Sequence, residues 1–140
     1  MDSSVLVKLV LREEASDEAE SAVIHLLEEE ETPSTTEIAL PEALNAIWKR
    51  AHLMRQLSKT DYRKVVGSTI RLVSRFRLVP TIEIAEVAAE VALKEGITFY
   101  DSLYLAAAQE LGVKLITADR RLYDAARGRV ESSLIGRIKD

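Results

Sequence analysis

The sequence predicts an α/β protein with an open parallel β-sheet flanked by helices on both faces. Segments with apolar residues at helical spacing alternate with short β-rich runs along the 140 residues, an order typical of parallel sheets. No repeat, low-complexity stretch or linker interrupts this alternation, and the length suits one domain. We therefore expect residues 1–140 to form a single domain with four or five short strands.

The first half of the chain is predicted to be mainly helical. Apolar residues recur at helical spacing in three segments, which are residues 5–11, 17–30 and 38–54. Pro41 lies within the third segment, so this helix either begins at Pro41 or begins near Thr36 and kinks. The β-branched run at residues 32–36 is predicted to be a strand or a turn between the helices.

The second half combines helices with short strands. Ser58-Lys59-Thr60-Asp61 resembles a capping box with Asp in place of Glu, and predicts the start of a helix there. Further helices are expected at residues 82–94, 102–111 and 121–127. Gly96, Gly112 and Gly128 follow them, at the position where a left-handed backbone favours glycine. Strands are predicted at residues 77–79 and 113–117, and one edge strand within 130–138.

Charge is strongly segregated along the chain. Eleven acidic residues and no Lys or Arg occur from Glu13 to Glu42, whereas nine basic residues and one acid occur from Lys49 to Arg77. A net charge of −4 alone argues against nucleic-acid binding, but this separation predicts a dipolar molecule with a basic flank that a phosphate backbone would follow. The candidate nucleic-acid contacts are Lys49, Arg50, Arg55 and Lys59. The alternative is a solubilising surface.

Composition excludes several classes of site. The chain has no cysteine and only two histidines, so thiolate zinc sites, disulfides and cysteine nucleophiles are excluded and a metal would be held by oxygen. No apolar run approaches the roughly 18 residues of a membrane span and no signal peptide is visible, so we expect a cytoplasmic protein without membrane contact. Few Asn and Gln residues beside 30% charged residues indicate a thermophile.

Four acidic residues are the candidate catalytic and metal-binding groups: Asp2, Glu42, Asp101 and Asp119. Each has an ordinary explanation, because each lies at or near a predicted helix start, where an acid caps the helix or suits its dipole. Turns that follow parallel strands meet at one edge of an open sheet, however, so acids at several such turns lie in one crevice.

Carboxylates gathered in this way repel one another unless a cation is present. Oxygen ligands select a hard ion such as Mg²⁺ or Mn²⁺. Such an ion lowers the pKa of a bound water and stabilises charge on a phosphoryl group. The pattern therefore indicates a phosphodiesterase without a protein nucleophile.

Four stretches that contain these acids resemble the motif blocks of PIN domains, and are most similar to VapC toxins of toxin–antitoxin pairs. They are residues 2–8 (DSSVLVK), 40–45 (LPEALN), 100–108 (YDSLYLAAA) and 115–122 (LITADRRL). The similarity spans nearly the whole chain, with the motifs in the same order and at similar spacing.

The resemblance implies a Mg²⁺-dependent endoribonuclease that forms a homodimer and is silenced by a VapB-type antitoxin near its active site. It implies that Asp2 and Asp101 touch the metal directly, and that Glu42 and Asp119 act through water. Ser4 and Thr117 match hydroxyls that position the acids, although helix capping and strand packing explain them equally well.

One feature departs from the family pattern. There the first Asp ends a central strand, whereas only Met1 precedes Asp2 here, so we expect that strand to be truncated or absent. This motivates an alternative function, a non-catalytic PIN-like module that binds RNA or a partner protein. A phosphatase or a receiver domain fits poorly, because position 4 is Ser and Thr117 is not followed by Lys.

Aromatic residues are assigned to packing. Trp48 lies in the apolar stripe of its helix, which predicts a core or dimer-interface position. Tyr100 and Tyr104 flank Asp101; stacking on an RNA base is the alternative for these two, but packing is preferred.

Overall fold

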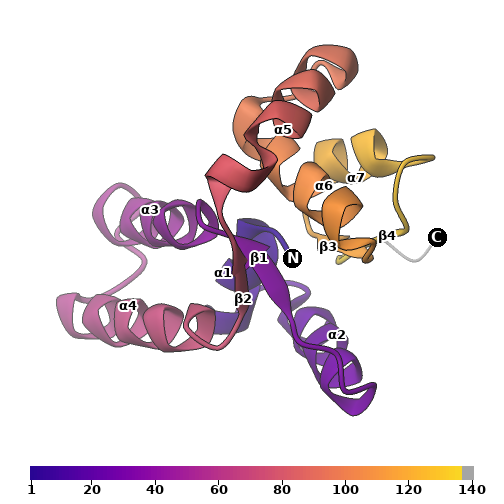
Figure 1. Ribbon diagram of the computed structural model, residues 1–140. Coiled ribbons are helices and arrows are strands. Elements are labelled where there is room, and N and C mark those ends of the chain that lie inside the picture. The colour runs from indigo at the N-terminus through magenta and orange to yellow at the C-terminus, as the bar shows by residue number, and fades with distance from the viewer. Residues whose placement is uncertain (137–140) are drawn as a thin grey trace.

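The structure, a computed structural model, describes residues 1–136. Helices and short strands alternate along this part of the chain (Figure 1). The helices are α1 (Ser3–Val10), α2 (Ser16–Glu28), α3 (Ala39–His52), α4 (Lys59–Val73), α5 (Thr81–Glu95), α6 (Phe99–Leu111) and α7 (Arg120–Ala126). The strands are β1 (Ser34–Thr36), β2 (Arg77–Val79), β3 (Leu115–Thr117) and β4 (Ser132–Leu134). No helix within residues 1–136 is long and apolar enough to cross a membrane.

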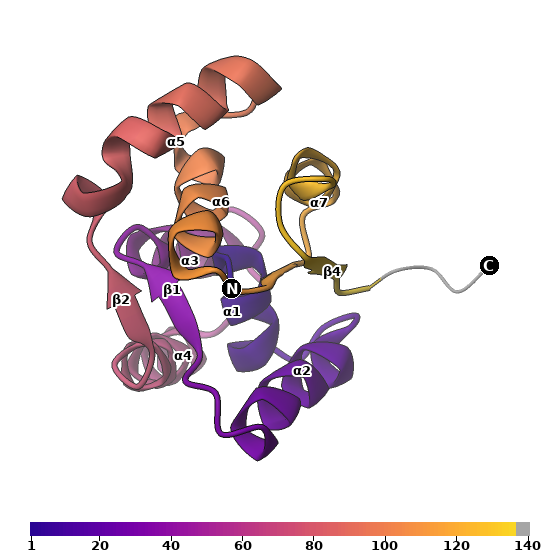
Figure 2. The ribbon, with the colours of Figure 1, turned by 45° about the vertical axis from the view of Figure 1, so that its right-hand side comes forward.

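The strands form two parallel pairs, β1 with β2 and β3 with β4. Met1 and Asp2 lie between the pairs: the amino group of Met1 donates to the carbonyl of Ser34 at 2.9 Å, and the amide of Asp2 donates to the carbonyl of Ile116 at 3.3 Å. Figures 1 and 2 both place the N-terminus in the middle of the molecule. The predicted α/β class is confirmed, but two strand pairs joined by two residues replace the expected continuous sheet.

A small cavity of about 20 Å³ lies between the two strand pairs. Its lining includes Met1, Thr36 of β1, Leu115 of β3 and Tyr104 of α6. The hydroxyl of Thr36 is buried there without a hydrogen-bond partner among the described residues.

Helices pack against both strand pairs. In Figure 1, α3 and α4 lie on the left, and α5, α6 and α7 lie on the upper right. The two most deeply buried helical segments are Val5–Val7 of α1 and Ser102–Ala108 of α6. Both buried segments begin within one turn of the acids at the starts of these helices, Asp2 and Asp101.

Local signals set most helix boundaries as predicted. The Ser58 hydroxyl accepts a hydrogen bond from the Asp61 amide at 3.0 Å, which confirms the predicted cap. Gly96 and Gly112 end their helices with φ of 64° and 63°, a conformation that costs glycine little. Helix α3 begins at Ala39, between the two predicted alternatives, so Pro41 lies in the first turn, where its missing N–H leaves no hydrogen bond unmade.

Trp48 is less buried than its spacing predicts. It is 41% exposed and stacks on His52 with ring centroids 5.1 Å apart, so its predicted core position is wrong within one chain. Trp48 directly follows the fully buried Ile47 and therefore lies on a different face of α3.

The burial of α6 generates a stability prediction. Leu105 is fully buried in the main core cluster, so Leu105→Ala is expected to lower the free energy of unfolding by about 2–5 kcal/mol through lost burial and a residual cavity. Leu93→Ala is the matched control, because Leu93 is 84% exposed; its expected change is below about 0.5 kcal/mol. Urea denaturation measures both, and equal effects would contradict this core assignment.

Candidate active site

The carboxylate of Asp2 is buried at the start of α1. Asp2 has an extended backbone and is the N-cap residue, and its Oδ1 accepts from the Val5 amide at 3.2 Å. The Ser4 hydroxyl donates to the same oxygen at 2.6 Å, and the Thr117 hydroxyl donates to Oδ2 at 2.5 Å. Asp2 is only 3% exposed, so these three donors replace the water that an aspartate normally binds.

The same two hydroxyls also hold the turn that follows β3. The Ala118 amide donates to Ser4 Oγ, and the Asp119 amide donates to Thr117 Oγ1, both at 2.9 Å. Asp119 in turn caps α7, because its Oδ1 accepts from the amides of Arg121 and Leu122. Ser4 and Thr117 therefore connect Asp2 to the segment that carries Asp119, 117 residues away in the sequence.

Glu42 lies in the first turn of α3 and contacts α6. The phenol of Tyr104 donates to Glu42 Oε2 at 2.5 Å. Tyr104 itself is 3% exposed, whereas Glu42 is half-buried. This contact fixes the first turn of α3 against the first half of α6.

Asp101 does not cap α6, contrary to its ordinary explanation. The N-cap residue is Thr98, whose hydroxyl accepts from the Asp101 amide at 3.1 Å and donates to Asp101 Oδ2 at 2.8 Å. Asp101 is the third residue of the helix, one turn before Tyr104, and is half-buried. The cap therefore orients the Asp101 carboxylate instead of being formed by it.

Burial and neighbouring charges shift the pKa values of Asp2 and Tyr104. Burial raises the pKa of Asp2 above its ordinary value, although the hydrogen bonds from Ser4 and Thr117 act in the opposite direction. Burial, together with the neighbouring Glu42 and the charge of Asp2, raises the pKa of Tyr104 well above its ordinary value. The dependence of the Tyr104 phenol on both acids means that Asp2 and Glu42 act on one local environment.

The four acids offer the type of ligand that a hard divalent cation prefers. Asp2, Glu42, Asp101 and Asp119 offer only oxygen atoms, which Mg²⁺ and Mn²⁺ prefer. Each acid caps a helix or lies in its first turn, so helix dipoles offset part of their repulsion. Within residues 1–136, however, no three acidic or histidine side chains lie close enough to hold an ion without adjusting.

The predicted basic contacts lie away from these acids. Lys49 and Arg50 are in the last turn of α3, and Arg55 and Lys59 lie around the connection to α4. Lys49 is seven residues beyond Glu42 on the same helix, a rise of about 10 Å. Arg50 forms an ion pair with Glu13, so its charge is already partly neutralised.

Comparisons with known proteins identify the family of this chain. A family model described as the PIN domain matches residues 1–128. The chain belongs to the PIN-domain family. Ribonuclease VapC3 of Pyrobaculum aerophilum is 35% identical over 125 residues, which cover 87% of this chain and 89% of that protein. The predicted VapC-like character is therefore confirmed.

Two further relatives come from the same organism. Exonuclease VapC9 is 31% identical over 94 residues, covering 67% of both chains. The crystal structure of the protein PAE2754 superposes with a TM-score of 0.67 at 26% identity, covering 94% of this chain and 86% of that chain. The helix-rich fold with parallel strands is thus also observed in this crystal structure.

Tyr104 has a role in this region beyond the packing that the sequence predicts. The structure shows this packing together with a hydrogen bond to Glu42. The sequence did contain one indication of this role. Tyr104 follows Asp101 by three residues, and residues three apart on a helix are neighbours on its surface. Tyr100, in contrast, is 58% exposed beside Asp101, so packing was the wrong assignment for Tyr100.

The raised pKa of Asp2 generates a prediction for Asp2→Asn. Between the ordinary aspartate pKa of about 3.9 and the higher folded value, the folded state binds more protons than the unfolded chain. The contribution of Asp2 to stability is therefore complete below that ordinary pKa and is lost as the pH rises through the folded pKa. The Asp2→Asn variant has no carboxyl group to ionise, so it avoids this loss of stability. We expect the variant to melt at a higher temperature than the original chain at pH 7 in the absence of divalent ions.

Thermal denaturation at pH 7 and near pH 4 measures this difference, which is expected to shrink at the lower pH. Asp17→Asn is the matched control, because Asp17 is exposed in a surface pair with Arg12, and such pairs contribute little. An Asp2→Asn variant that is less stable than the original chain at pH 7 would contradict the proposed cost of burying this carboxylate.

Proposed function

We propose that this protein is a metal-dependent endoribonuclease of the VapC type, the toxin of a toxin–antitoxin pair. The hydrogen-bond network that runs from Asp2 through Ser4 and Thr117 to the turn of Asp119 carries the proposal. It brings two acids of separate PIN motifs into one region of the fold. The printed names of the relatives, Ribonuclease VapC3 and Exonuclease VapC9, support a nuclease activity.

Mg²⁺ or Mn²⁺ is the proposed cofactor. Asp2 and Asp101 are proposed to contact it directly, and Glu42 and Asp119 through water. When bound, the ion would supply an activated water and stabilise charge on the phosphate. The chain's own residues would orient the ligands: Ser4 and Thr117 fix both oxygens of Asp2, and Thr98 fixes one oxygen of Asp101.

We propose that the protein is cytoplasmic and that its substrate is RNA. Lys49, Arg55 and Lys59 are exposed and are proposed to contact its phosphates together with Arg50. Phosphate contacts of this kind set the position of the RNA without reading its sequence. The basic flank would therefore extend the binding surface well beyond the acids.

A VapB-type antitoxin and a second copy of the chain are the proposed protein partners. The support is the number of large apolar side chains left exposed, including Ile82 and Leu93 of α5 and Leu53 and Met54 after α3. Surfaces of this kind mark interaction sites when they are contiguous. Size-exclusion chromatography with light scattering measures the oligomeric state directly.

The first functional prediction concerns Asp101→Asn and Asp119→Asn. Each replaces a carboxylate by an amide of the same shape, so the fold is expected to survive while Mn²⁺-dependent RNA cleavage falls by at least roughly 100-fold through lost charge stabilisation. Single-turnover cleavage of a labelled RNA at saturating Mn²⁺ measures the rate. Circular dichroism checks the fold, and Asp124→Asn in α7 is the matched control.

Normal cleavage by Asp101→Asn would contradict the proposed function. A circular RNA separates the modes of attack, since an endonuclease opens it and an exonuclease leaves it intact. A chain that binds RNA but neither binds Mn²⁺ nor cleaves would instead support the non-catalytic module.

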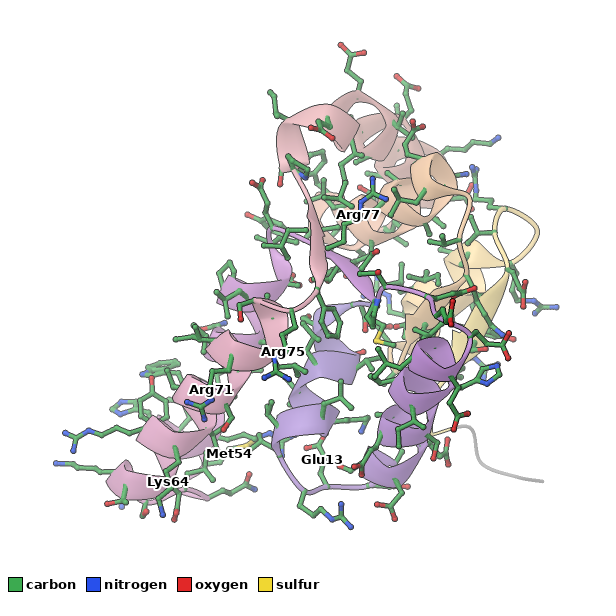
Figure 3. The ribbon with its side chains drawn as sticks, turned by 60° about the horizontal axis from the view of Figure 1, so that its bottom comes forward. Glu13, Met54, Lys64, Arg71, Arg75 and Arg77 are labelled. Carbon is green, nitrogen blue, oxygen red and sulfur yellow. The ribbon has the colours of Figure 1, made fainter. Side chains whose placement is uncertain are left out.

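The second functional prediction concerns the basic flank. Reversing Lys49, Arg55 and Lys59 to Glu is expected to raise KM for RNA and to lower the salt dependence of binding, by a slope of about 0.7 per lost phosphate contact. The matched control reverses Lys64 and Arg71 of α4 and Arg75 just after it, which lie in a row in Figure 3. A larger effect from the α4 row would contradict our choice of RNA-contacting residues.

A further inference from the structure

Tyr104 is the one phenol within the fully covered segment of α6. Residues Ser102–Ala108 are all buried, and the other six side chains of this segment are Ser, Leu or Ala. The Tyr104 ring packs in the main core cluster together with Leu105 and Ala43. Its hydroxyl reaches out of this cluster to Glu42 Oε2 at 2.5 Å.

The two carboxylate oxygens of Glu42 differ in their hydrogen bonding. Oε2 accepts the Tyr104 hydrogen bond, whereas Oε1 accepts none from the described part of the protein. A carboxylate held at one oxygen by a buried donor has a defined orientation, and its second oxygen stays available. The side chain of Glu42 has three rotatable bonds, so without such a donor a half-buried glutamate samples several rotamers.

The donor is also chemically well suited to this position. A tyrosine phenol, with an ordinary pKa of about 10, retains its proton at neutral pH. A neutral donor orients a carboxylate without cancelling its charge, whereas a Lys or Arg would form an ion pair. Glu42 therefore keeps its full attraction for a cation.

The helix that carries Tyr104 also carries Asp101. The two residues are three apart, and therefore lie on neighbouring positions of the helix surface. The Asp101 carboxylate is held by the Thr98 cap, and the Glu42 carboxylate is held by Tyr104. Helix α6 thus determines the relative position of two acids that belong to different helices.

We propose that Tyr104 is a positioning residue, whose hydroxyl orients the Glu42 carboxylate toward the metal-binding crevice. This inference rests on the proposed function, because it assigns Glu42 to that crevice. It adds a residue outside the four acids and their supporting hydroxyls.

The test is Tyr104→Phe, which keeps the ring and removes one oxygen atom. The expected result is a fall in Mn²⁺ affinity of up to about 10-fold, the lower end of the effect seen when a partner of a directly bound side chain is removed, because Glu42 is proposed to act through water. The value of kcat is expected to fall at limiting Mn²⁺, while KM for RNA stays unchanged because Tyr104 is buried. Calorimetry with Mn²⁺ alone gives the affinity without any reference to catalysis.

Tyr62→Phe is the matched control. Tyr62 is a half-buried phenol of α4 that packs against the same core cluster. The substitution removes the same atom far from Glu42 in the fold, so Mn²⁺ affinity is expected to stay within error of the original chain. Equal losses from both variants would assign the effect to packing and overturn the proposal.

A double-mutant cycle with Glu42→Gln tests whether Tyr104 acts through Glu42. If it does, Tyr104→Phe has little further effect once the carboxylate has been removed, so the two losses are not additive. Fully additive losses in Mn²⁺ affinity would overturn the positioning role. If Tyr104→Phe does not fold, Glu42→Asp tests the same contact by drawing the carboxylate back from the hydroxyl, and original affinity in that variant would overturn it.

The outcomes separate this inference from the proposed function. Tyr104→Phe with the original Mn²⁺ affinity and cleavage rate overturns the role of Tyr104 and leaves the ribonuclease intact. An original chain that binds Mn²⁺ but cleaves no RNA overturns the ribonuclease, and a weaker Mn²⁺ affinity of Tyr104→Phe would still support the positioning role.

Discussion

The buried carboxylate of Asp2 is the group on which the centre of this fold depends. Its backbone joins the two strand pairs, through Met1 to β1 and through its own amide to β3. Its side chain meets donors from both α1 and β3. Removing a carboxylate from water is costly unless every oxygen is paired, so the surrounding segments must stay in register to satisfy it. The interactions that join the halves of the fold are therefore also those that bring Asp2 close to the turn of Asp119.

Helix capping and metal binding are compatible roles for these acids. Asp2 caps α1 and Asp119 caps α7, as their ordinary explanation predicts. Capping by Asp119 engages only its Oδ1, which leaves the second oxygen available for a ligand. A helix N-terminus stabilises a nearby negative charge by about 0.3–1 kcal/mol. This offsets only part of the repulsion among several carboxylates, so the arrangement remains suited to a cation.

Features that depend on neighbouring residues, such as helix caps, could be predicted from the sequence. Features that depend on contacts between distant residues could not. The Ser58 cap and the Gly96 and Gly112 helix ends were predicted because each depends on a few neighbouring residues. The start of α6 was misplaced because Thr98 competes with Asp101 for the cap. The contact between Tyr104 and Glu42 joins residues 62 apart, and no periodicity encodes such a pair. Likewise, Trp48 is exposed although the preceding Ile47 is fully buried, so tertiary contacts decide which face of α3 meets the core, and the apolar stripe alone does not specify this.

The kind of partner that surrounds each acid distinguishes a binding site from a structural cluster. The carboxylates of Asp2, Glu42 and Asp101 accept side-chain hydrogen bonds only from hydroxyl groups within the described residues, and Asp119 accepts from backbone amides. None of the ion pairs formed among these residues includes any of the four acids. Even Arg120, next to Asp119 in the sequence, pairs with Asp124 instead. Carboxylates that only stabilised the fold would be expected to attract Lys or Arg; neutral donors orient them and leave their charge for an external cation.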